Sequence, residues 1–315
     1  MTDAKVDVAI QAFGRPYQSA LTLLSLSHYC SKNINKIFFI IECVKPKFET
    51  IEVTVLKDIV PNMETVLLQE WIGATVEDFS LLRETKYRQA VRYQYAFEHT
   101  TQDFMLILHN DINFTDNPIP KLLENIDNNI AVGELGQCWN CPASREHIVK
   151  KLNINNGIPC TPTTYRDFKL TFSDLDTMYH LVKANKEHYR DFLKGPWAVE
   201  FQKKPWPLPE CRINEWCCII NMQLAKKTTI PVGNARPIGL SASRADTGVA
   251  WFRDVHHMGY HAKHVSINNY YEHRSGYTNL WYPEKYEEAE QRAKSILLQS
   301  YPRKCRELAD RGIII

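Results

Sequence analysis

The sequence has no long apolar run and no excess of charge of one sign. Its longest apolar run, Ile37–Ile41, is far shorter than the roughly 20 residues that a membrane-spanning helix requires. Lysine and arginine number 38 and aspartate and glutamate 36, so the net charge is only +2. A protein whose main partner is a polyanion carries a strong positive charge, and nucleic acid is therefore not an expected partner.

The N-terminal residues MTDAKVDV also lack the apolar core of a secretion signal. We therefore expect a cytoplasmic protein without a membrane span, which leaves peripheral association with a membrane open. With 315 residues, of which 44% are hydrophobic, the chain can bury a sizeable core.

The nine cysteines do not form a complete metal-binding pattern in the sequence. Cys138 and Cys141 have the CxxC spacing of zinc ligands, but no second CxxC pair completes a four-thiolate site. The sequence therefore favours free thiols in a reducing compartment over structural zinc or disulfides.

The first 140 residues alternate between apolar strands and helices. Residues 36–44 and 104–108 are near-continuous apolar runs, as expected of parallel strands buried on both faces. The expected strands are 6–13, 36–44, 66–68, 104–108 and 131–135, and the expected helices are 17–28, 85–99 and 118–127. This alternation predicts an α/β fold with a mixed, mostly parallel sheet flanked by helices.

The second half of the chain is less regular. We interpret residues 145–209, rich in Tyr, Trp, Lys and Pro, as an insertion that covers the site. The elements expected after it are a strand leading into a helix over 215–226, a helix over 249–258, a strand over 264–271 and a helical tail over 284–310 interrupted at Pro302. The predicted organisation is one domain over 1–282, followed by a C-terminal helical tail over 283–315.

A carboxylate follows the predicted strand at 104–108. The chain continues from this strand into His109, Asn110 and Asp111. Ligands bind at the carboxyl ends of the strands of an open parallel sheet, which is where Asp111 is expected. A divalent cation held by a carboxylate can neutralise the charge of a nucleoside diphosphate. A surface turn without a ligand is the alternative interpretation of Asp111.

The same segment resembles a known family. His-Asn-Asp at 109–111 resembles the DxD-type motif of GT-A glycosyltransferases, whose family 2-like members often replace the first Asp by Asn or His. The opening VDVAIQAFGRPYQSALTLLSL, residues 6–26, is similar to their first strand, nucleotide-binding loop and first helix. The resemblance implies a Rossmann-like GT-A fold, a Mn²⁺ or Mg²⁺ ion and a UDP- or GDP-linked sugar donor.

The resemblance also implies which residues bind the donor. Phe13 and Arg15 fall in the loop that matches the nucleotide-binding loop, and Glu42 stands where an Asp usually ends the second strand. Asn110 and Asp111 belong to the metal motif, with Asp111 binding the ion together with the diphosphate.

Arg15 and Arg88 are both candidate contacts of the diphosphate or the base. A guanidinium group gives bidentate hydrogen bonds to phosphate oxygens, although two solvated surface arginines would look the same in the sequence.

Two carboxylates compete for the role of general base. Asp246 lies in a segment, 244–260, that resembles the acceptor side of the family, where an acidic residue opens a helix that carries an Arg and ends in Gly-Tyr. In an inverting transfer a carboxylate accepts the proton of the attacking hydroxyl. Glu215 is the competing base. The structural alternatives are a helix N-cap for Asp246 and an ion pair with Arg212 for Glu215.

A histidine follows the last predicted strand of the domain. Residues 270–276 resemble the segment where family members carry a His followed by Ser or Gly, and by that match His273 binds the metal or contacts the diphosphate. We therefore expect His273 to lie close to Asp111. A loop histidine bonded to Glu272 or to the backbone is the alternative.

Aromatic residues between 195 and 216 favour a carbohydrate partner. Trp197, Phe201, Trp206 and Trp216 are suited to pack on sugar rings, although each could equally belong to the core.

The order of Asp111, Asp246 and His273 predicts a metal-dependent, inverting glycosyltransferase. It would move a sugar from a nucleotide-diphosphate donor to a hydroxyl of a glycan, polysaccharide or lipid-linked acceptor. A nucleotidyltransferase is the first alternative, but residues 13–16 lack the Gly-rich phosphate loop expected of it. A catalytically inactive sugar-binding protein is the second.

Overall fold

In the described part of the chain, seven strands form the central sheet: β1 (Val6–Ala12), β2 (Ile34–Ile41), β3 (Met63–Leu67), β4 (Phe104–Leu108), β6 (Ala131–Leu135), β7 (Ile213–Asn221) and β8 (Ala262–His264). They belong to a computed structural model that describes residues 4–44, 46, 49, 51–72, 79–182, 193, 197–241, 245–273 and 282–312. The strand order is β3-β2-β1-β4-β7-β6-β8. A smaller sheet pairs β5 (Ile112–Phe114) with β9 (Tyr271–His273).

The central sheet is parallel except at β7. This strand runs antiparallel to both of its neighbours, β4 and β6, whereas the β1–β2, β1–β4, β2–β3 and β6–β8 pairs are parallel. The predicted α/β fold with a mixed, mostly parallel sheet flanked by helices is confirmed.

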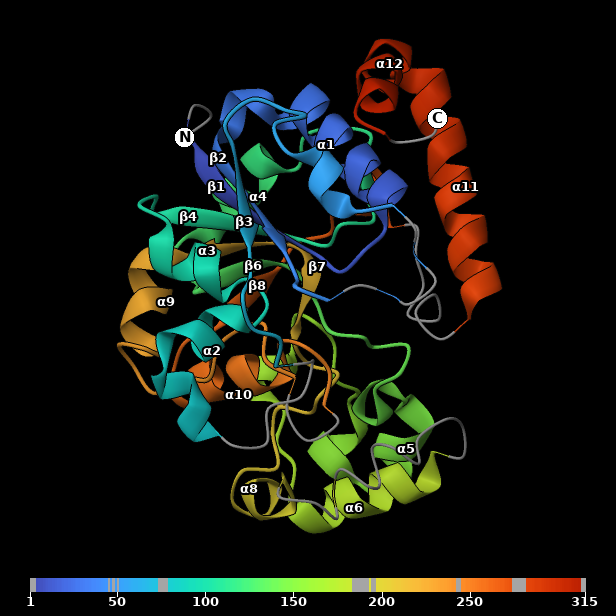
Figure 1. Ribbon diagram of the computed structural model, residues 1–315. Coiled ribbons are helices and arrows are strands. Elements are labelled where there is room, and N and C mark those ends of the chain that lie inside the picture. Colours follow the sequence, from blue (N-terminus) through green and yellow to red (C-terminus); the bar gives the residue numbers. More distant parts are fainter. Residues whose placement is uncertain are drawn as a thin grey trace.

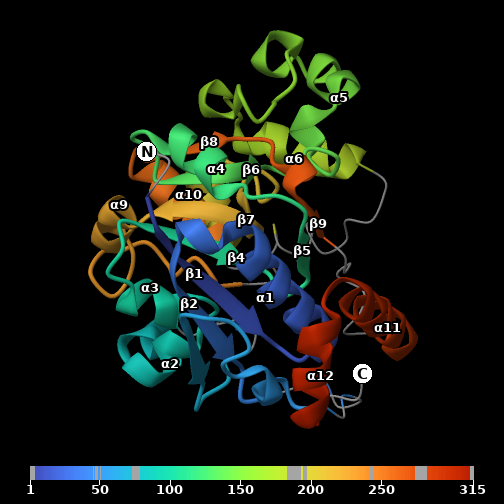
Figure 2. The same cartoon turned by 90° about the horizontal axis from the view of Figure 1, so that it is seen from above.

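Helices cover both faces of the sheet, as Figures 1 and 2 show. One face packs on α1 (Pro16–Cys30), α4 (Ile119–Ile126), α11 (Pro283–Ser300) and α12 (Pro302–Asp310), the other on α2 (Thr85–Ala90), α3 (Gln94–His99), α9 (Met222–Thr228) and α10 (Val249–His257). In β2, Phe38 and Ile40 belong to one core and Ile37 and Phe39 to the other. Successive strand residues point to opposite faces, so an uninterrupted apolar run buries both.

The segment interpreted as an insertion contributes α5 (Glu146–Lys151), α6 (Phe172–Leu181) and α8 (Trp197–Lys203), which lie at one end of the molecule in Figure 1. Short 3-10 helices occupy Ser31–Asn33, Val53–Leu56, Phe79–Arg83, Pro142–Ser144, Ile154–Gly157, Tyr165–Asp167 and Asn268–Tyr270.

The continuous helix predicted over 85–99 is wrong, because α2 and α3 are separated by residues 91–93. Tyr93 has a left-handed backbone with φ of 67°. Its N–H donates to the side-chain oxygen of Gln11 at 2.9 Å, so the end of β1 supplies the hydrogen bond that a helical turn would have made. The break turns Arg92 towards Gly239, with which it forms an isolated β-bridge.

The strand predicted over 264–271 is also wrong. The chain forms β8, then a loop with a 3-10 turn, and then β9, whose pairing with β5 sets His273 opposite Ile112. This pairing brings the end of β9 to residues that directly follow β4.

The helical tail was predicted correctly, including its interruption at Pro302. It lies beside α1 in both views. The buried Glu290 of α11 accepts hydrogen bonds from the backbone N–H groups of Tyr17 and Gln18, at 2.9 and 3.2 Å, and from the Gln18 amide. Neither α11 nor any other described helix is long and apolar enough to cross a lipid bilayer.

We predict that Glu290→Ala lowers the free energy of unfolding by about 1–3 kcal/mol, because it leaves buried donors of α1 without an acceptor. Chemical denaturation of the full chain measures this change. Glu288→Ala, at an exposed position of the same helix, is the control and should change it little. Equal stability of the two variants would contradict a structural role for Glu290.

Candidate functional site

Three side chains with metal-ligand chemistry meet beyond the carboxyl end of β4. His109 and Asp111 follow β4, and His273 ends β9. One ligand atom from each lies within 4.8 Å of the other two. His273 Nε2 is 3.2 Å from Asp111 Oδ1, and His109 Nδ1 is 3.9 Å from the same oxygen. His273 is thus as close to Asp111 as the sequence analysis expected, and its role stays a prediction.

The topology of the sheet explains why the cluster forms here. In the order β3-β2-β1-β4, β2 and β3 are added on one side of β1 and β4 on the other. The switch point of the sheet therefore lies between the parallel strands β1 and β4, and the gap beyond their carboxyl ends is the ligand crevice of an open α/β sheet. Arg15 lies just after β1, Glu42 after β2 and His109 after β4. Residues from three separate loops therefore reach one crevice.

Arg15 joins the cluster from the β1–α1 loop. Its Nη1 donates to Asp111 Oδ2 at 2.9 Å, while Asp111 Oδ1 faces the two histidines. Burial raises the pKa of Asp111, but His273, Arg15 and His109 lower it by more, so the pKa lies well below its usual value. Asp111 is therefore an anion at neutral pH, oriented by a cation on one side and imidazoles on the other.

The loop that carries Arg15 depends on a glycine and on Asn110. Gly14 has φ of +68°, and a Cβ at this position would lie 1.8 Å from Glu49 Oε2. Asn110 donates to Gly14 O at 3.2 Å and to Ser19 Oγ at 2.9 Å. Its amide nitrogen thus holds the β1–α1 loop, whereas the sequence predicted a ligand contact.

Both candidate bases lie on the side of the cluster formed by β7. Glu215 Oε1 is 3.6 Å from His109 Nε2, and Glu215 Oε2 is 3.8 Å from Arg212 Nε. Arg212 Nη2 also contacts Asp246 Oδ2 at 2.6 Å. The Asp246 side chain is 50% exposed and that of Glu215 only 5%, so a dissolved acceptor reaches Asp246 more readily.

The environments of the two carboxylates differ accordingly. Burial raises the pKa of Glu215, while Arg212 and His109 lower it by more, and the resulting pKa is below the usual value. Asp246 is not the N-cap of α10, because Gly248 occupies that position with φ of 83°. Asp246 instead accepts from the Thr247 N–H at 2.9 Å. Arg244, which begins the matched segment, lies outside the described residues.

Glu42 and Arg92 form the part of the crevice beyond β2. Glu42 accepts hydrogen bonds from Gln11 Nε2 at 3.1 Å and Trp71 Nε1 at 3.2 Å, and Arg92 Nη2 lies 3.9 Å from it. Burial lowers the pKa of Arg92, but Glu42 and more distant acidic groups raise it by more. Phe13, at the end of β1, is partly buried.

Arg88, which the sequence predicted as a contact of the diphosphate or the base, is bound by other protein groups, and its role stays a prediction. Arg88 is buried and is bound to Glu98 at 2.7 Å, with further bonds to the carbonyls of Leu82 and Arg83. These contacts hold its guanidinium between α2 and α3. Arg92 faces Glu42 instead, because the chain breaks between the two helices, and no pattern in the sequence marked that break.

Most of the aromatic residues proposed for carbohydrate binding belong to the core. Trp197, Phe201 and Trp206 are at most 9% exposed. Trp216 is the exception among the four, since it is half-buried and its ring centroid lies 5.1 Å from that of His273. Its indole N–H donates to the Tyr271 hydroxyl at 2.9 Å.

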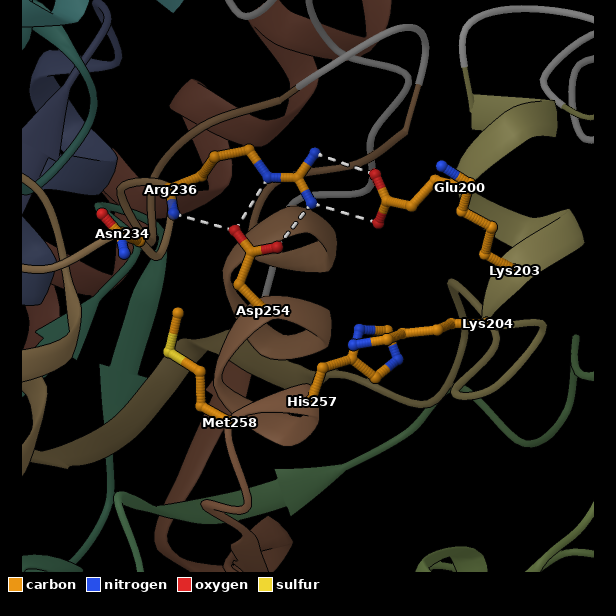
Figure 3. A pocket seen from close by; sticks show the side chains of 8 residues that line it. All are labelled: Glu200, Lys203, Lys204, Asn234, Arg236, Asp254, His257 and Met258. Carbon is orange, nitrogen blue, oxygen red and sulfur yellow. Dashed lines mark hydrogen bonds and ion pairs between the residues drawn. The ribbon is translucent and has the colours of Figure 1, made fainter.

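A hollow of about 360 Å³ lies between α8 and α10, away from this cluster (Figure 3). Its central guanidinium, Arg236, is paired with Asp254 at 2.6 Å and with Glu200 at 3.2 Å. The charges therefore satisfy one another, and the network fastens the insertion to α10. The remaining lining residues are Lys203, Lys204, Asn234, His257 and Met258.

The cluster of His109, Asp111 and His273 fits a divalent cation. Two imidazoles and one carboxylate leave coordination positions open for phosphate oxygens. The carboxylate suits Mn²⁺ or Mg²⁺, and the imidazoles favour a transition metal such as Mn²⁺ over Mg²⁺. Glu215 lies beside the second nitrogen of His109, at the position from which an outer partner would orient a metal-binding histidine. His109 belongs to the motif at 109–111, but the resemblance did not imply that it is a ligand.

No family model matches the chain, and no curated protein sequence matches it. Solved structures that it is similar to include GT-A glycosyltransferases. One is a mannosyltransferase from Pyrobaculum calidifontis in complex with GDP-Man and Mn²⁺, with 11% identity, coverage of 98% of this chain and 73% of that one, and a TM-score of 0.46.

A second is glucosyl-3-phosphoglycerate synthase from Mycobacterium tuberculosis in complex with Mn²⁺, UDP-glucose and glycerol 3-phosphate, with 9% identity, coverage of 94% and 79%, and a TM-score of 0.41. A third is the galactosyltransferase LgtC with donor and acceptor sugar analogues, with 12% identity, coverage of 49% and 54%, and a TM-score of 0.31. Identities of this size give no residue-by-residue correspondence.

We predict that replacing Arg88 affects stability and that replacing Arg92 affects nucleotide binding. Arg88→Ala should lower the free energy of unfolding by about 3 kcal/mol, the lower end of the range for breaking a buried ion pair. Arg92→Ala should leave stability nearly unchanged and weaken nucleoside diphosphate binding about tenfold or more, since a hydrogen bond to a charged group contributes about 1.5–3 kcal/mol.

Urea unfolding and calorimetry with UDP and GDP in the presence of Mn²⁺ separate the two effects. Lys36→Ala, an exposed cation paired with Glu64 at the far end of β2, is the matched control for loss of charge. Nucleotide binding that depends on Arg88 but not on Arg92 in folded protein would reverse the assignment.

Proposed function

We propose that the chain is a metal-dependent glycosyltransferase that moves a sugar from a UDP- or GDP-linked donor to a hydroxyl acceptor with inversion. The observation that carries the proposal is the meeting of His109, Asp111 and His273 at the switch point of the sheet, beside Arg15. This is the crevice in which an open α/β sheet binds a nucleotide.

In this proposal His109, Asp111 and His273 hold the ion, with Mn²⁺ preferred over Mg²⁺. A bound divalent cation neutralises the charge that develops on the diphosphate as it leaves. Arg15 adds a fixed positive charge at the same place, and its side chain can hydrogen-bond a phosphate oxygen beside Asp111. Asn110 keeps Arg15 in position through Gly14 and Ser19.

The nucleoside end of the donor would extend along the carboxyl ends of β1 and β2. Phe13 lies at the first of these ends and Glu42 at the second, with Arg92 facing Glu42. A carboxylate such as Glu42 can accept hydrogen bonds from ribose hydroxyls, and a half-buried aromatic can contact the base. The crevice therefore has one acidic and one basic group at each end of the proposed donor site, Glu42 with Arg92 and Asp111 with Arg15.

Asp246 is the proposed general base. It is half exposed, and Arg212 holds its carboxylate at 2.6 Å. Its Oδ atoms can take the proton of the acceptor hydroxyl as that oxygen attacks the anomeric carbon. Glu215 is buried against His109, so we assign to it the orientation of that histidine rather than the proton transfer.

The hydrogen bonds at the N-terminus of α1 disfavour the nucleotidyltransferase alternative. A phosphate commonly binds such a helix N-terminus in nucleotide-binding sheets. Here the Glu290 carboxylate already accepts the N–H groups of Tyr17 and Gln18. The negative charge of a diphosphate must therefore be neutralised elsewhere, which favours the cluster of His109, Asp111 and His273.

The acceptor, the domain organisation and the location are proposed only as classes. The acceptor is a glycan, a polysaccharide or a lipid-linked hydroxyl, and the insertion over 145–209 would cover it within a domain spanning 1–282. Residues 283–315 would form an appended tail. The nine cysteines, all of which lie in the described residues, form no disulfide. Free thiols favour the reducing cytoplasm as the location.

We predict that Asp111→Ala abolishes Mn²⁺-dependent binding of UDP or GDP while the fold is kept. Calorimetry with and without Mn²⁺ measures the binding, and release of nucleoside diphosphate from UDP- and GDP-sugars measures the activity. Asp116→Ala, an exposed carboxylate beyond β5, is the control. Nucleotide affinity that is unchanged in folded Asp111→Ala would remove the basis of the proposal.

If the wild-type protein binds the nucleotide with Mn²⁺ but releases no nucleoside diphosphate from any sugar donor, it is a sugar-binding protein without activity. Pyrophosphate released from a nucleoside triphosphate and a sugar phosphate would identify a nucleotidyltransferase.

We further predict that Asp246→Asn lowers turnover by on the order of 10²-fold or more and leaves the affinity for Mn²⁺ and nucleotide intact. Glu215→Gln should instead weaken Mn²⁺ binding by roughly 10–100-fold, as expected for the outer partner of a metal-binding histidine. Measuring kcat at saturating Mn²⁺ separates the two. If Glu215→Gln abolishes turnover at saturating Mn²⁺ and Asp246→Asn does not, Glu215 is the base.

A further inference from the structure

Four cysteines from distant parts of the chain meet at the neck of the insertion. One small cavity is lined by Cys138, Cys141, Cys160 and Cys211. Its volume of about 10 Å³ is enough for one atom or ion. Two of these residues have the CxxC spacing, and the fold adds the other two. This cluster lies apart from His109, Asp111 and His273 and does not depend on the proposed function.

The backbone explains why the four residues converge. The chain entering the insertion and the chain leaving it are paired, since Gly136 N–H donates to Arg212 O at 2.6 Å and Gln137 N–H to Glu210 O at 2.7 Å. This pairing extends the contact of β6 with β7 and brings Cys138 beside Cys211.

Within the CxxC segment the backbone makes a tight turn, with Cys141 N–H donating to Cys138 O at 3.2 Å. Ser144 Oγ donates to the carbonyls of both cysteines. Cys160 joins from the insertion, where its N–H donates to Ala143 O at 2.9 Å. The four positions are thus fixed by main-chain bonds that do not involve the thiols.

The thiols influence one another strongly. Burial raises the pKa of Cys211 most, and hydrogen bonding with Cys141 and Cys160 raises it further. Burial, together with Cys141 and Cys160, raises the pKa of Cys138 to about 11. None of the four forms a disulfide.

We propose that Cys138, Cys141, Cys160 and Cys211 bind one zinc ion as a tetrahedral thiolate site that fastens the insertion to the sheet. Zinc takes four thiolates at about 2.3 Å, which places the sulfur atoms about 3.8 Å apart. Among the described residues, three ligand atoms within 4.8 Å of one another are found at His109, Asp111 and His273 and not at the cysteines, so the four sulfur atoms would have to approach one another by rotation about their Cα–Cβ bonds when the ion binds.

Zinc is favoured over the divalent cations Mg²⁺, Ca²⁺ and Mn²⁺ by the type of ligand. Thiolates are soft ligands that Mg²⁺, Ca²⁺ and Mn²⁺ bind poorly. Each thiol loses one proton to solvent when its Zn–S bond forms, so binding of Zn²⁺ releases up to about four protons and changes no oxidation state.

The site would also order the acceptor side of the crevice. Cys211 directly precedes Arg212, which contacts both Glu215 and Asp246. Fixing Cys211 to Cys138 and Cys160 therefore fixes the start of β7 and the insertion together. Loss of the ion should loosen this region before it affects β1, β2 or β4.

The first experiment is metal analysis of the full chain carrying Asp111→Ala, which removes a ligand from the other candidate site. Protein purified under reducing conditions without chelator should hold close to one zinc per chain. Titration of reduced, metal-free protein with Co²⁺ should give thiolate-to-cobalt charge-transfer absorption, which nitrogen and oxygen ligands do not produce. Metal-free protein that gives no such absorption, or the absence of zinc in the purified protein, would overturn the proposal.

Cys138→Ser in the same background tests the ligands, because Cys138 is the least buried of the four. It should lose the charge-transfer band or shift it, and its zinc content should fall. Cys43→Ser, exposed, and Cys305→Ser, buried in α12, are the controls and should retain both. Equal zinc content in all three variants would overturn the ligand assignment.

A third measurement does not depend on the folding of any variant. In the Asp111→Ala protein, a mercurial reagent that titrates thiols should release zinc in step with modification of four cysteines. Intact-mass analysis after alkylation should show no disulfide in protein that holds zinc. Disulfides among these four cysteines in protein kept reduced would show that the cluster is a covalent crosslink and not a metal site.

Discussion

The buried charge of Asp111 is the constraint that organises the loops at the carboxyl edge of the sheet. A carboxylate this deeply buried is costly unless cations or donors surround it. Arg15 on one side and His273 on the other supply that compensation. Arg15 comes from the β1–α1 loop and His273 from β9. The need to compensate the Asp111 charge therefore ties both segments to the end of β4.

This requirement explains features that look unrelated in the chain. The N–H of Arg15 donates to the Tyr286 hydroxyl at 2.8 Å, which links α11 to the same loop. Gly14 lies where any side chain would meet Glu49. The tail is therefore part of what holds Arg15 beside Asp111, and a chain ending before α11 would lose support for the cluster as well as for α1.

β7 has a comparable role on the acceptor side. As the strand that runs against its neighbours, it carries its N-terminal end to the carboxyl ends of β4 and β6. Arg212 and Glu215 therefore reach the crevice from the opposite direction, and Trp216 O accepts the His109 N–H at 3.1 Å. Reversal of one strand thus brings two sets of polar residues to one edge of the sheet.

Apolar runs predicted the sheet well, because a strand buried on both faces leaves a continuous signal, as in β2 and β4. The break between α2 and α3 left none, since it depends on a hydrogen bond from the Tyr93 N–H to the side chain of Gln11, which is distant in sequence. The position of Arg92 beside Glu42 could not be predicted for that reason. Cys160 and Cys211 were missed because a ligand set assembled across an insertion has no fixed spacing.

The contact between Glu290 and α1 shows how the same sheet can serve different phosphate chemistry. In dinucleotide-binding sheets the first helix N-terminus and a Gly-rich turn bind the phosphates. Here a carboxylate from the C-terminal tail takes those N–H groups, and residues 13–16 supply a single glycine. Because the helix can no longer offer its N–H groups to a ligand, positive charge must come from side chains or a bound ion. In the proposed function, Arg15 and an ion held by His109, Asp111 and His273 would provide it one loop away, so the tail and the cluster would together determine how an anionic ligand is bound.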